Sequence, residues 1–196
     1  MSTTSSLSHA PLPTGPHKSE AMTLIRQVLD FIGDRPLDGA LEFELNRRFG
    51  PYGAFHDRLA TLMKAGIAEG WAGYAPVEGA GYSRGHIAEV SEDTRGMRVE
   101  SGLMRDVVGQ HHRHIRGEID LVIPLDAGAR WCGHGAGWVV YPPGSEHFPT
   151  TEGGQALILF FLPGGAIEYR PPPAELASER FGAAQAGQGT SAAPPP

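Results

Sequence analysis

The sequence predicts a mainly β domain preceded by a helical segment. Three stretches between residues 19 and 68 carry apolar residues at helical spacing. From about Gly81 to Arg170, short runs rich in branched and aromatic residues are separated by Gly and Pro. This second pattern is typical of a β-sandwich or a small barrel. We therefore expect a helical cap over residues 19–80 and a barrel over residues 81–170.

The helical segment divides into three predicted helices. The first covers residues 19–32, with one apolar stripe and Ser19 as the expected N-cap. The second covers residues 37–49 and the third residues 55–68. Three short helices could also form a winged-helix unit, but this segment has no excess of basic residues to favour DNA. A cap on the following domain is the favoured arrangement.

The strand pattern predicts a barrel with disordered flanks. The predicted strands span residues 85–90, 97–108, 119–125, 137–141, 156–162 and 167–170. Small barrels hold a ligand inside, with inward-facing residues alternating along each strand. Residues 1–18 are rich in Ser, Thr and Pro, and residues 171–196 in Ala, Gly, Gln and Pro. Both tails lack the apolar residues of a core and are predicted to be disordered.

Composition excludes several classes of partner. A length of 196 residues suits one compact domain with attachments, and the net charge of −6 argues against a nucleic-acid-binding surface. The longest apolar run, Ala156–Leu162, is far shorter than a membrane span, and the N-terminus does not resemble a signal peptide. The single cysteine, Cys132, excludes an intramolecular disulfide and fits a reducing compartment. We expect a cytoplasmic protein without nucleic-acid or membrane partners.

Three histidines and one glutamate form a candidate metal site. His112 and His114 are two residues apart, so on a strand they point to the same face, and Glu118 follows four residues later. His147 arrives on a later strand, behind a Pro-Gly turn. Three imidazoles and a carboxylate suit a divalent first-row ion such as Fe²⁺, Mn²⁺, Ni²⁺ or Zn²⁺. Strand alternation points His111 away from this set.

The alternative is that these histidines are ordinary surface or loop residues. The chain has nine histidines, so a chance His-x-His pair is unremarkable. A chance carboxylate at the right offset, followed by Pro-x-Gly-x-x-His, is much rarer. The combined pattern therefore favours a metal site.

Several further residues are candidates for binding an anionic substrate. A guanidinium pairs with a carboxylate through two hydrogen bonds, which makes Arg105 and Arg116 candidates for substrate binding and catalysis, together with Glu118. Arg105 shares its face with apolar residues, and it either lines the barrel or reaches water at an edge. Trp138 and Phe161 are candidates for an aromatic pocket, although core packing is the commoner role for such residues.

The two histidine motifs resemble those of the cupin superfamily. His112-x-His114-x-x-x-Glu118 is similar to the first cupin motif and Pro142-x-Gly144-x-x-His147 to the second. The resemblance covers about residues 81–170 and implies a double-stranded β-helix, or jelly-roll, barrel. It also implies that His112, His114, Glu118 and His147 bind the metal, and that the protein is a homodimer.

A closer resemblance covers the whole pattern. A helical segment, the stretch from His114 to Leu121 and the closing stretch from Phe160 to Tyr169 resemble the bacterial 4-hydroxylaminobenzoate lyase family. This resemblance implies conversion of 4-hydroxylaminobenzoate to 3,4-dihydroxybenzoate with release of ammonia. The alternatives are a cupin-type iron dioxygenase of an aromatic substrate, a ligand-sensing cupin with a helical module, and a metal-free binding module, because fold alone does not determine function.

Overall fold

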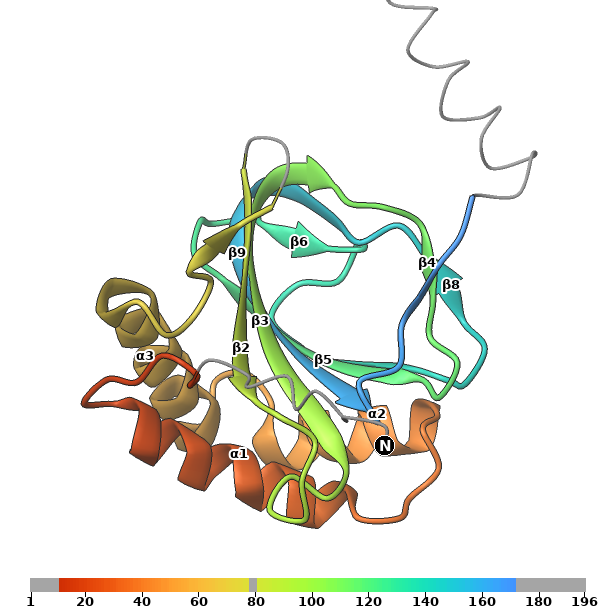
Figure 1. Cartoon of the computed structure of the whole chain (residues 1–196), viewed down its shortest axis with the longest axis horizontal. Coiled ribbons are helices and arrows are strands. Elements are labelled where there is room, and N and C mark those ends of the chain that lie inside the picture. The colour runs from red at the N-terminus through yellow and green to blue at the C-terminus, as the bar shows by residue number, and fades with distance from the viewer. Residues whose placement is uncertain (1–10, 78–80, 172–196) are drawn as a thin grey trace, which may run out of the picture.

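The computed structural model describes residues 11–77 and 81–171. Within these residues three helices precede ten strands (Figure 1). The helices are α1 (Lys18–Ile32), α2 (Gly39–Phe49) and α3 (Ala54–Glu69). The strands are β1 (Ala75–Pro76), β2 (Tyr82–Ala88), β3 (Met97–Val108), β4 (His112–Arg113), β5 (Glu118–Pro124), β6 (Arg130–Trp131), β7 (Gly137–Tyr141), β8 (Glu146–His147), β9 (Thr150–Pro163) and β10 (Glu168–Tyr169).

The strands form two antiparallel sheets that enclose a barrel. The larger sheet has the order β1-β2-β3-β9-β5-β7, with β6 also paired to β9, and the smaller sheet has the order β10-β4-β8. Figure 1 shows β4 and β8 on the opposite side of the barrel from β3 and β9. The predicted fold class, a mainly β barrel with an N-terminal helical segment, is confirmed.

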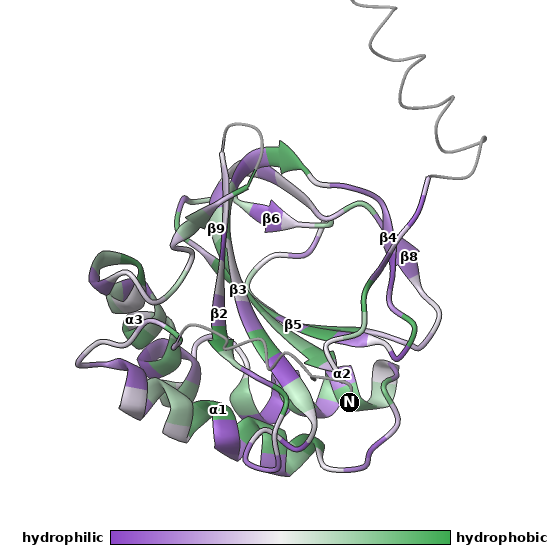
Figure 2. Cartoon of the chain, in the orientation of Figure 1, coloured by the Kyte–Doolittle hydropathy of each residue, from purple (hydrophilic) through white to green (hydrophobic). Residues whose placement is uncertain are grey.

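The central strands are apolar on both faces because each face covers a different core. In β9, Leu159 and Phe161 pack with the helices, whereas Ile158 and Phe160 point into the barrel. The same alternation in β5 turns Leu121 toward the helices. Figure 2 shows hydrophobic residues along these strands and on the helix sides that face them. The helices therefore close the outer face of the sheet and leave its inner face to the barrel.

The helical predictions are confirmed, with one correction at a helix start. α1 begins at Lys18 and its N-cap is His17, so the expected cap, Ser19, lies inside the first turn. α2 begins at Gly39 because the Asp38 carboxylate accepts hydrogen bonds from the amides of the next turn, at Ala40 and Leu41. Among the described residues, no helix is long and apolar enough to cross a membrane.

The predicted tails fall partly within the described residues. The structure places residues 11–17 beside α3, where His17 pairs with Glu69 and the backbone amide of His17 donates to the Glu69 carboxylate at 3.2 Å. Residues 1–10 and 172–196, where the remaining tail predictions fall, lie outside the described residues.

Candidate metal centre

Two strand pairs and one tight turn bring the predicted ligands together. β4 and β8 pair so that His112 lies directly opposite His147. The chain then turns between His114 and Glu118, where Gly117 has a φ of +84°. A side chain at Gly117 would also meet the carbonyl oxygen of Tyr141 at 2.7 Å, so both the backbone angle and the space require glycine. Glu118 then begins β5 with its side chain inside the barrel.

The four side chains converge on one point. Ligand atoms from His112, His114, Glu118 and His147 all lie within 4.8 Å of one another. The Nε2 atoms of the three histidines form a triangle with sides of 2.9, 3.1 and 3.1 Å, and Glu118 Oε2 lies 2.9 Å from His114 Nε2. Nitrogen atoms bound at about 2.1 Å to one ion, at right angles to one another, are about 3 Å apart. The spacing fits a shared divalent ion.

The protonation of the histidines also fits a metal. Burial lowers the pKa of His112 and His114 to about 4 and that of His147 to about 3, and the neighbouring imidazoles add to the shift at His112 and His147. All three are therefore neutral at pH 7, as metal ligands must be. His112 Nδ1 lies 3.0 Å from the carbonyl oxygen of Gln110, which assigns the proton to Nδ1 and leaves the Nε2 lone pair facing the cluster.

Glu118 and the neighbouring Asp120 lie in a barrel interior that disfavours negative charge. Burial raises the pKa of Glu118, the charge of Glu100 adds to this shift, and Arg84 opposes it. Burial also raises the pKa of Asp120, which accepts a hydrogen bond from Trp131 Nε1 at 2.7 Å. A divalent cation at the cluster would favour the ionised form of Glu118.

A cavity of about 360 Å³ opens beside the cluster. Its wall combines His112, Glu118 and His147 with mainly apolar and aromatic side chains from both sheets. These side chains include Tyr82, Val107, Trp131, Phe160, Leu162, Ile167 and Tyr169. Such a cavity suits a small ligand that carries an aromatic ring.

The structure does not bring the two predicted arginines to this cavity. Arg105 shares the face of β3 that packs toward the helices and pairs with Asp126 at 2.7 Å, at an exposed site. Arg116 is exposed in the turn before Gly117 and lies beside Gly164. That turn interrupts the alternation on which its predicted orientation depended, and neither arginine lines the cavity.

The predicted aromatic residues also lie elsewhere. Trp138 and Phe161 belong to the core between the sheet and the helices, with ring centroids 5.6 Å apart. Trp138 Nε1 donates to the carbonyl oxygen of Phe49 at 3.0 Å. Alternation along β9 instead turns Phe160 toward the cavity. Phe160 thus occupies the position expected for Phe161.

Three polar cavity residues escaped sequence analysis. Tyr82 and Arg84 share the inner face of β2, but the predicted strand began at Gly85 and excluded both. Tyr169 pairs in register with His112 through β10 and β4. Extending the predicted strand by three residues would have placed Tyr82 and Arg84 on one face, whereas no local signal connects Tyr169 to His112.

Comparison with solved structures finds partial matches at low sequence identity. The DMSP lyase DddQ from Ruegeria pomeroyi matches with a TM-score of 0.49 and 14% identity, over 82% of this chain and all of that chain. A cupin-like protein from Thermotoga maritima matches with a TM-score of 0.40 and 13% identity, over 55% of this chain and 92% of that chain.

Sequence comparison is more specific. The family model for PnbB, 4-hydroxylaminobenzoate lyase, matches residues 23–169. A 4-hydroxylaminobenzoate lyase from Nocardioides sp. (strain LMS-CY) is 38% identical over 75% of this chain and 92% of its own length. Its counterpart from Pseudomonas putida is 34% identical over 74% of this chain and 93% of its own length. This chain belongs to the 4-hydroxylaminobenzoate lyase family.

Proposed function

We propose that this protein is a metal-dependent lyase that converts 4-hydroxylaminobenzoate and water to 3,4-dihydroxybenzoate and ammonia. The observation that supports it best is the convergence of three neutral imidazoles and one carboxylate at the wall of an aromatic-lined cavity. Two relatives are named 4-hydroxylaminobenzoate lyase, which supports 4-hydroxylaminobenzoate as the substrate. The reaction balances without an oxidant, because one water enters and one ammonia leaves.

His112, His114, Glu118 and His147 would hold the ion. Imidazole nitrogen and carboxylate oxygen suit Fe²⁺, Mn²⁺, Ni²⁺ and Zn²⁺ alike. Such an ion, when bound, supplies a Lewis acid that polarises an oxygen atom of the substrate.

The remaining cavity residues position the substrate. Trp131, Phe160 and Leu162 present apolar surfaces that would cover an aromatic ring and exclude water from it. The hydrogen bond between His112 and the Gln110 carbonyl holds that imidazole in one orientation.

Product analysis tests the reaction. Purified protein loaded with each candidate metal is incubated with 4-hydroxylaminobenzoate under anaerobic conditions, and ammonia and 3,4-dihydroxybenzoate are measured. We expect the two products in equal amounts. Oxygen consumption that is required for turnover would replace this proposal with the dioxygenase alternative, and no product with any metal would contradict it.

Ligand variants test the role of the metal. We expect His112→Ala and His147→Ala to lose bound metal, measured by elemental analysis, and to lose activity with it. His134→Ala is the matched control, because His134 is exposed and lies outside the cluster. Wild-type metal content in both ligand variants would contradict the proposed site.

Two wider expectations remain predictions. The homodimer implied by the cupin resemblance can be tested by light scattering on the purified protein. The cytoplasmic location can be tested by fractionating cells that express it.

A further inference from the structure

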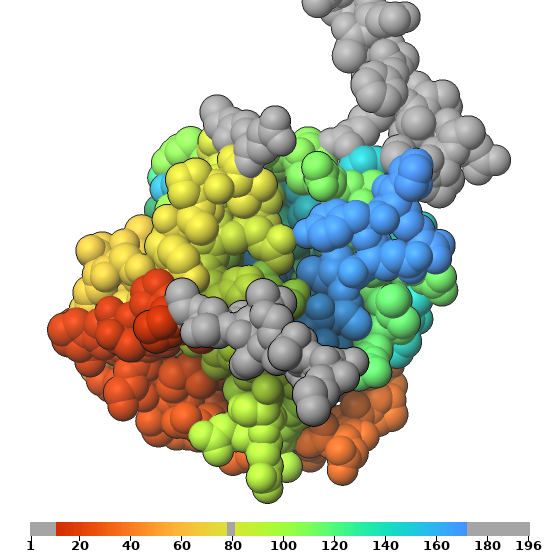
Figure 3. Space-filling view, in the orientation of Figure 1, coloured from red at the N-terminus to blue at the C-terminus, as the bar shows by residue number. Residues whose placement is uncertain are grey.

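Arg84 lines both the candidate metal cavity and a neighbouring hollow that contains Arg98 and Glu100. It lies on the inner face of β2 and lines the cavity with His112, Glu118 and His147. Among the described residues of this wall, Arg84 is the only arginine or lysine. It also lines a second hollow beyond the cavity, between β1–β2 and the segment 165–169. Figure 3 shows this face, with β1 and β2 in yellow and the C-terminal segment in blue.

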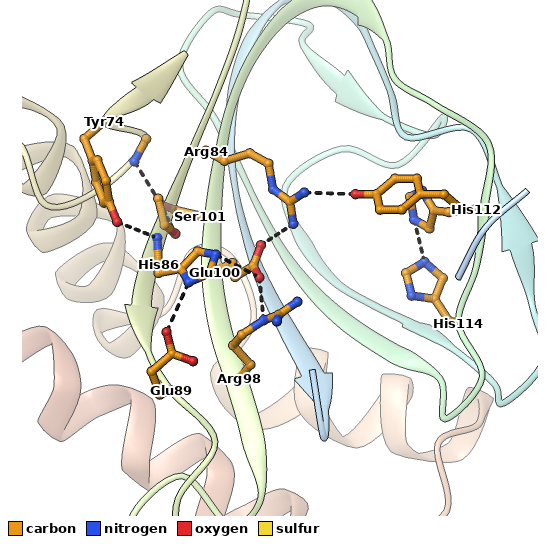
Figure 4. Close-up of polar contacts among 12 residues, drawn as sticks. Tyr74, Arg84, His86, Glu89, Arg98, Glu100, Ser101, His112 and His114 are labelled. Carbon is orange, nitrogen blue, oxygen red and sulfur yellow. Dashed lines mark hydrogen bonds and ion pairs between the residues drawn. The ribbon is translucent and has the colours of Figure 1, made fainter. Parts of the chain in front are cut away.

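A buried carboxylate holds Arg84 in place. Arg84 Nη2 donates to Glu100, whose side chain is fully buried, and Arg98 Nε lies 2.5 Å from the same carboxylate. Figure 4 shows both guanidinium groups directed at Glu100, with His86 on its other side. Two guanidinium groups share one carboxylate, so Arg84, Arg98 and Glu100 together carry one net positive charge. That charge favours a further anion.

Arg84 also keeps hydrogen-bond donors for a ligand. A guanidinium carries five N–H groups, and Arg84 uses Nη2 on Glu100 and Nη1 on the Tyr169 hydroxyl at 3.0 Å. Nη1 and Nη2 each carry two N–H groups, so each retains one beyond these two bonds. A carboxylate is the ligand that a guanidinium pairs with most strongly.

The side chain of Tyr169 contacts both Arg84 and His112. The ring of Tyr169 lies 5.7 Å from the ring of His112, measured between centroids, and its hydroxyl contacts Arg84. A benzoate with a polar substituent in the para position resembles this arrangement, because one ring separates its two polar ends. A substrate lying alongside Tyr169 would therefore contact Arg84 and the cluster at once.

We propose that Arg84 binds the carboxylate of a para-substituted benzoate whose other end reaches His112, His114, Glu118 and His147, and that Glu100 positions the Arg84 guanidinium. This inference rests on the proposed function for the identity of the substrate. It assigns the carboxylate to Arg84 in place of the exposed Arg105 and Arg116.

Ligand binding tests the assignment without turnover. Calorimetry on metal-loaded protein compares 4-hydroxybenzoate with its uncharged analogue 4-hydroxybenzamide. We expect the wild type to prefer the carboxylate, and Arg84→Gln to weaken carboxylate binding by about 30-fold or more while amide binding is retained. Arg84→Lys should recover part of the preference, because it restores the charge without the paired donors. Arg105→Gln is the matched control and should bind as the wild type does.

A second variant is needed because Arg84→Gln removes one of the positive charges that stabilise the buried Glu100 carboxylate. Arg84→Gln/Glu100→Gln removes the half-buried guanidinium together with the buried carboxylate it pairs with, and it should fold and bind metal as the wild type does yet lack the preference for carboxylate. Glu100→Gln alone should weaken the preference, since Arg84 loses its anchor. The inference is overturned if the wild type shows no preference, or if the double variant keeps it.

The same data separate this inference from the proposed function. A wild type that prefers 4-hydroxybenzoate through Arg84 but releases no ammonia from 4-hydroxylaminobenzoate would refute the reaction and retain the carboxylate site. A wild type that releases ammonia while the double variant keeps its carboxylate preference would refute the carboxylate site alone.

Discussion

Phe160 and Phe161 are neighbours on β9 that serve opposite faces of the larger sheet. Phe161 is 0% exposed, and its ring lies 5.6 Å from that of Trp138 in the core beneath the helices. Phe160 is 6% exposed, lies 5.5 Å from Trp131 and lines the cavity. Replacing each with alanine removes the same atoms from two different surroundings.

The two variants should differ in stability and in binding. Phe161→Ala leaves a void that is enclosed by packed side chains, and we expect the free energy of unfolding to fall by about 3–5 kcal/mol. Phe160→Ala enlarges an existing cavity and loses fewer contacts, so we expect about half that loss. Binding of 4-hydroxybenzoate should weaken about tenfold in Phe160→Ala, because the ligand ring loses an apolar wall. Phe161→Ala should bind the ligand normally where it remains folded.

Urea unfolding followed by circular dichroism measures the stabilities, and calorimetry measures the binding. Phe161→Leu and Phe160→Leu are milder variants that keep more of the apolar volume, and they should show the same order with smaller effects. An equal or greater loss of stability in the Phe160 variants, or weaker ligand binding in the Phe161 variants, would refute the assignment of faces.

Two further predictions concern the helix–sheet contact and the histidines. Asn46 connects α2 to β7 through two hydrogen bonds. Its side chain donates to the Trp138 carbonyl at 2.8 Å and accepts from the Trp138 amide at 2.9 Å. Asn46→Ala should lower the free energy of unfolding by about 1–3 kcal/mol, measured in urea, and Asn46→Asp should also destabilise, because a carboxylate oxygen cannot donate to the Trp138 carbonyl. In chelator-treated protein, burial lowers the pKa of His114 from 6.5 to about 4, so the unfolded state binds more protons between these values and stability should fall as pH drops through this range. His114→Ala should show a flatter dependence in urea unfolding across this pH range, and an unchanged slope would contradict this origin.

Local patterns predicted the elements of the fold well. Three helices were expected at residues 19–32, 37–49 and 55–68, and they occur within two residues of these limits. Helix spacing depends on neighbours three and four residues apart, which sequence displays directly. Short pairings were harder: β1 and β6 each contain two residues and depend on partners distant in sequence.

The candidate ligands were also accessible to sequence, for a similar reason. His112, His114 and Glu118 are close along the chain, and His147 carries a recognisable turn before it. The structure brings all four together. Their role as metal ligands stays a proposal until metal content is measured.

The sequence by itself determined the helix and strand pattern and the four residues of the metal motif, because both depend on spacing along the chain. Only the tertiary structure decided which face of each strand lines the cavity. Both faces of the larger sheet are covered, so β9 carries apolar residues on each face, and alternation alone could not separate Phe160 from Phe161. The tertiary structure likewise placed Arg84 against Glu100 and Tyr169, 16 and 85 residues away, through strand pairings that no local pattern encodes.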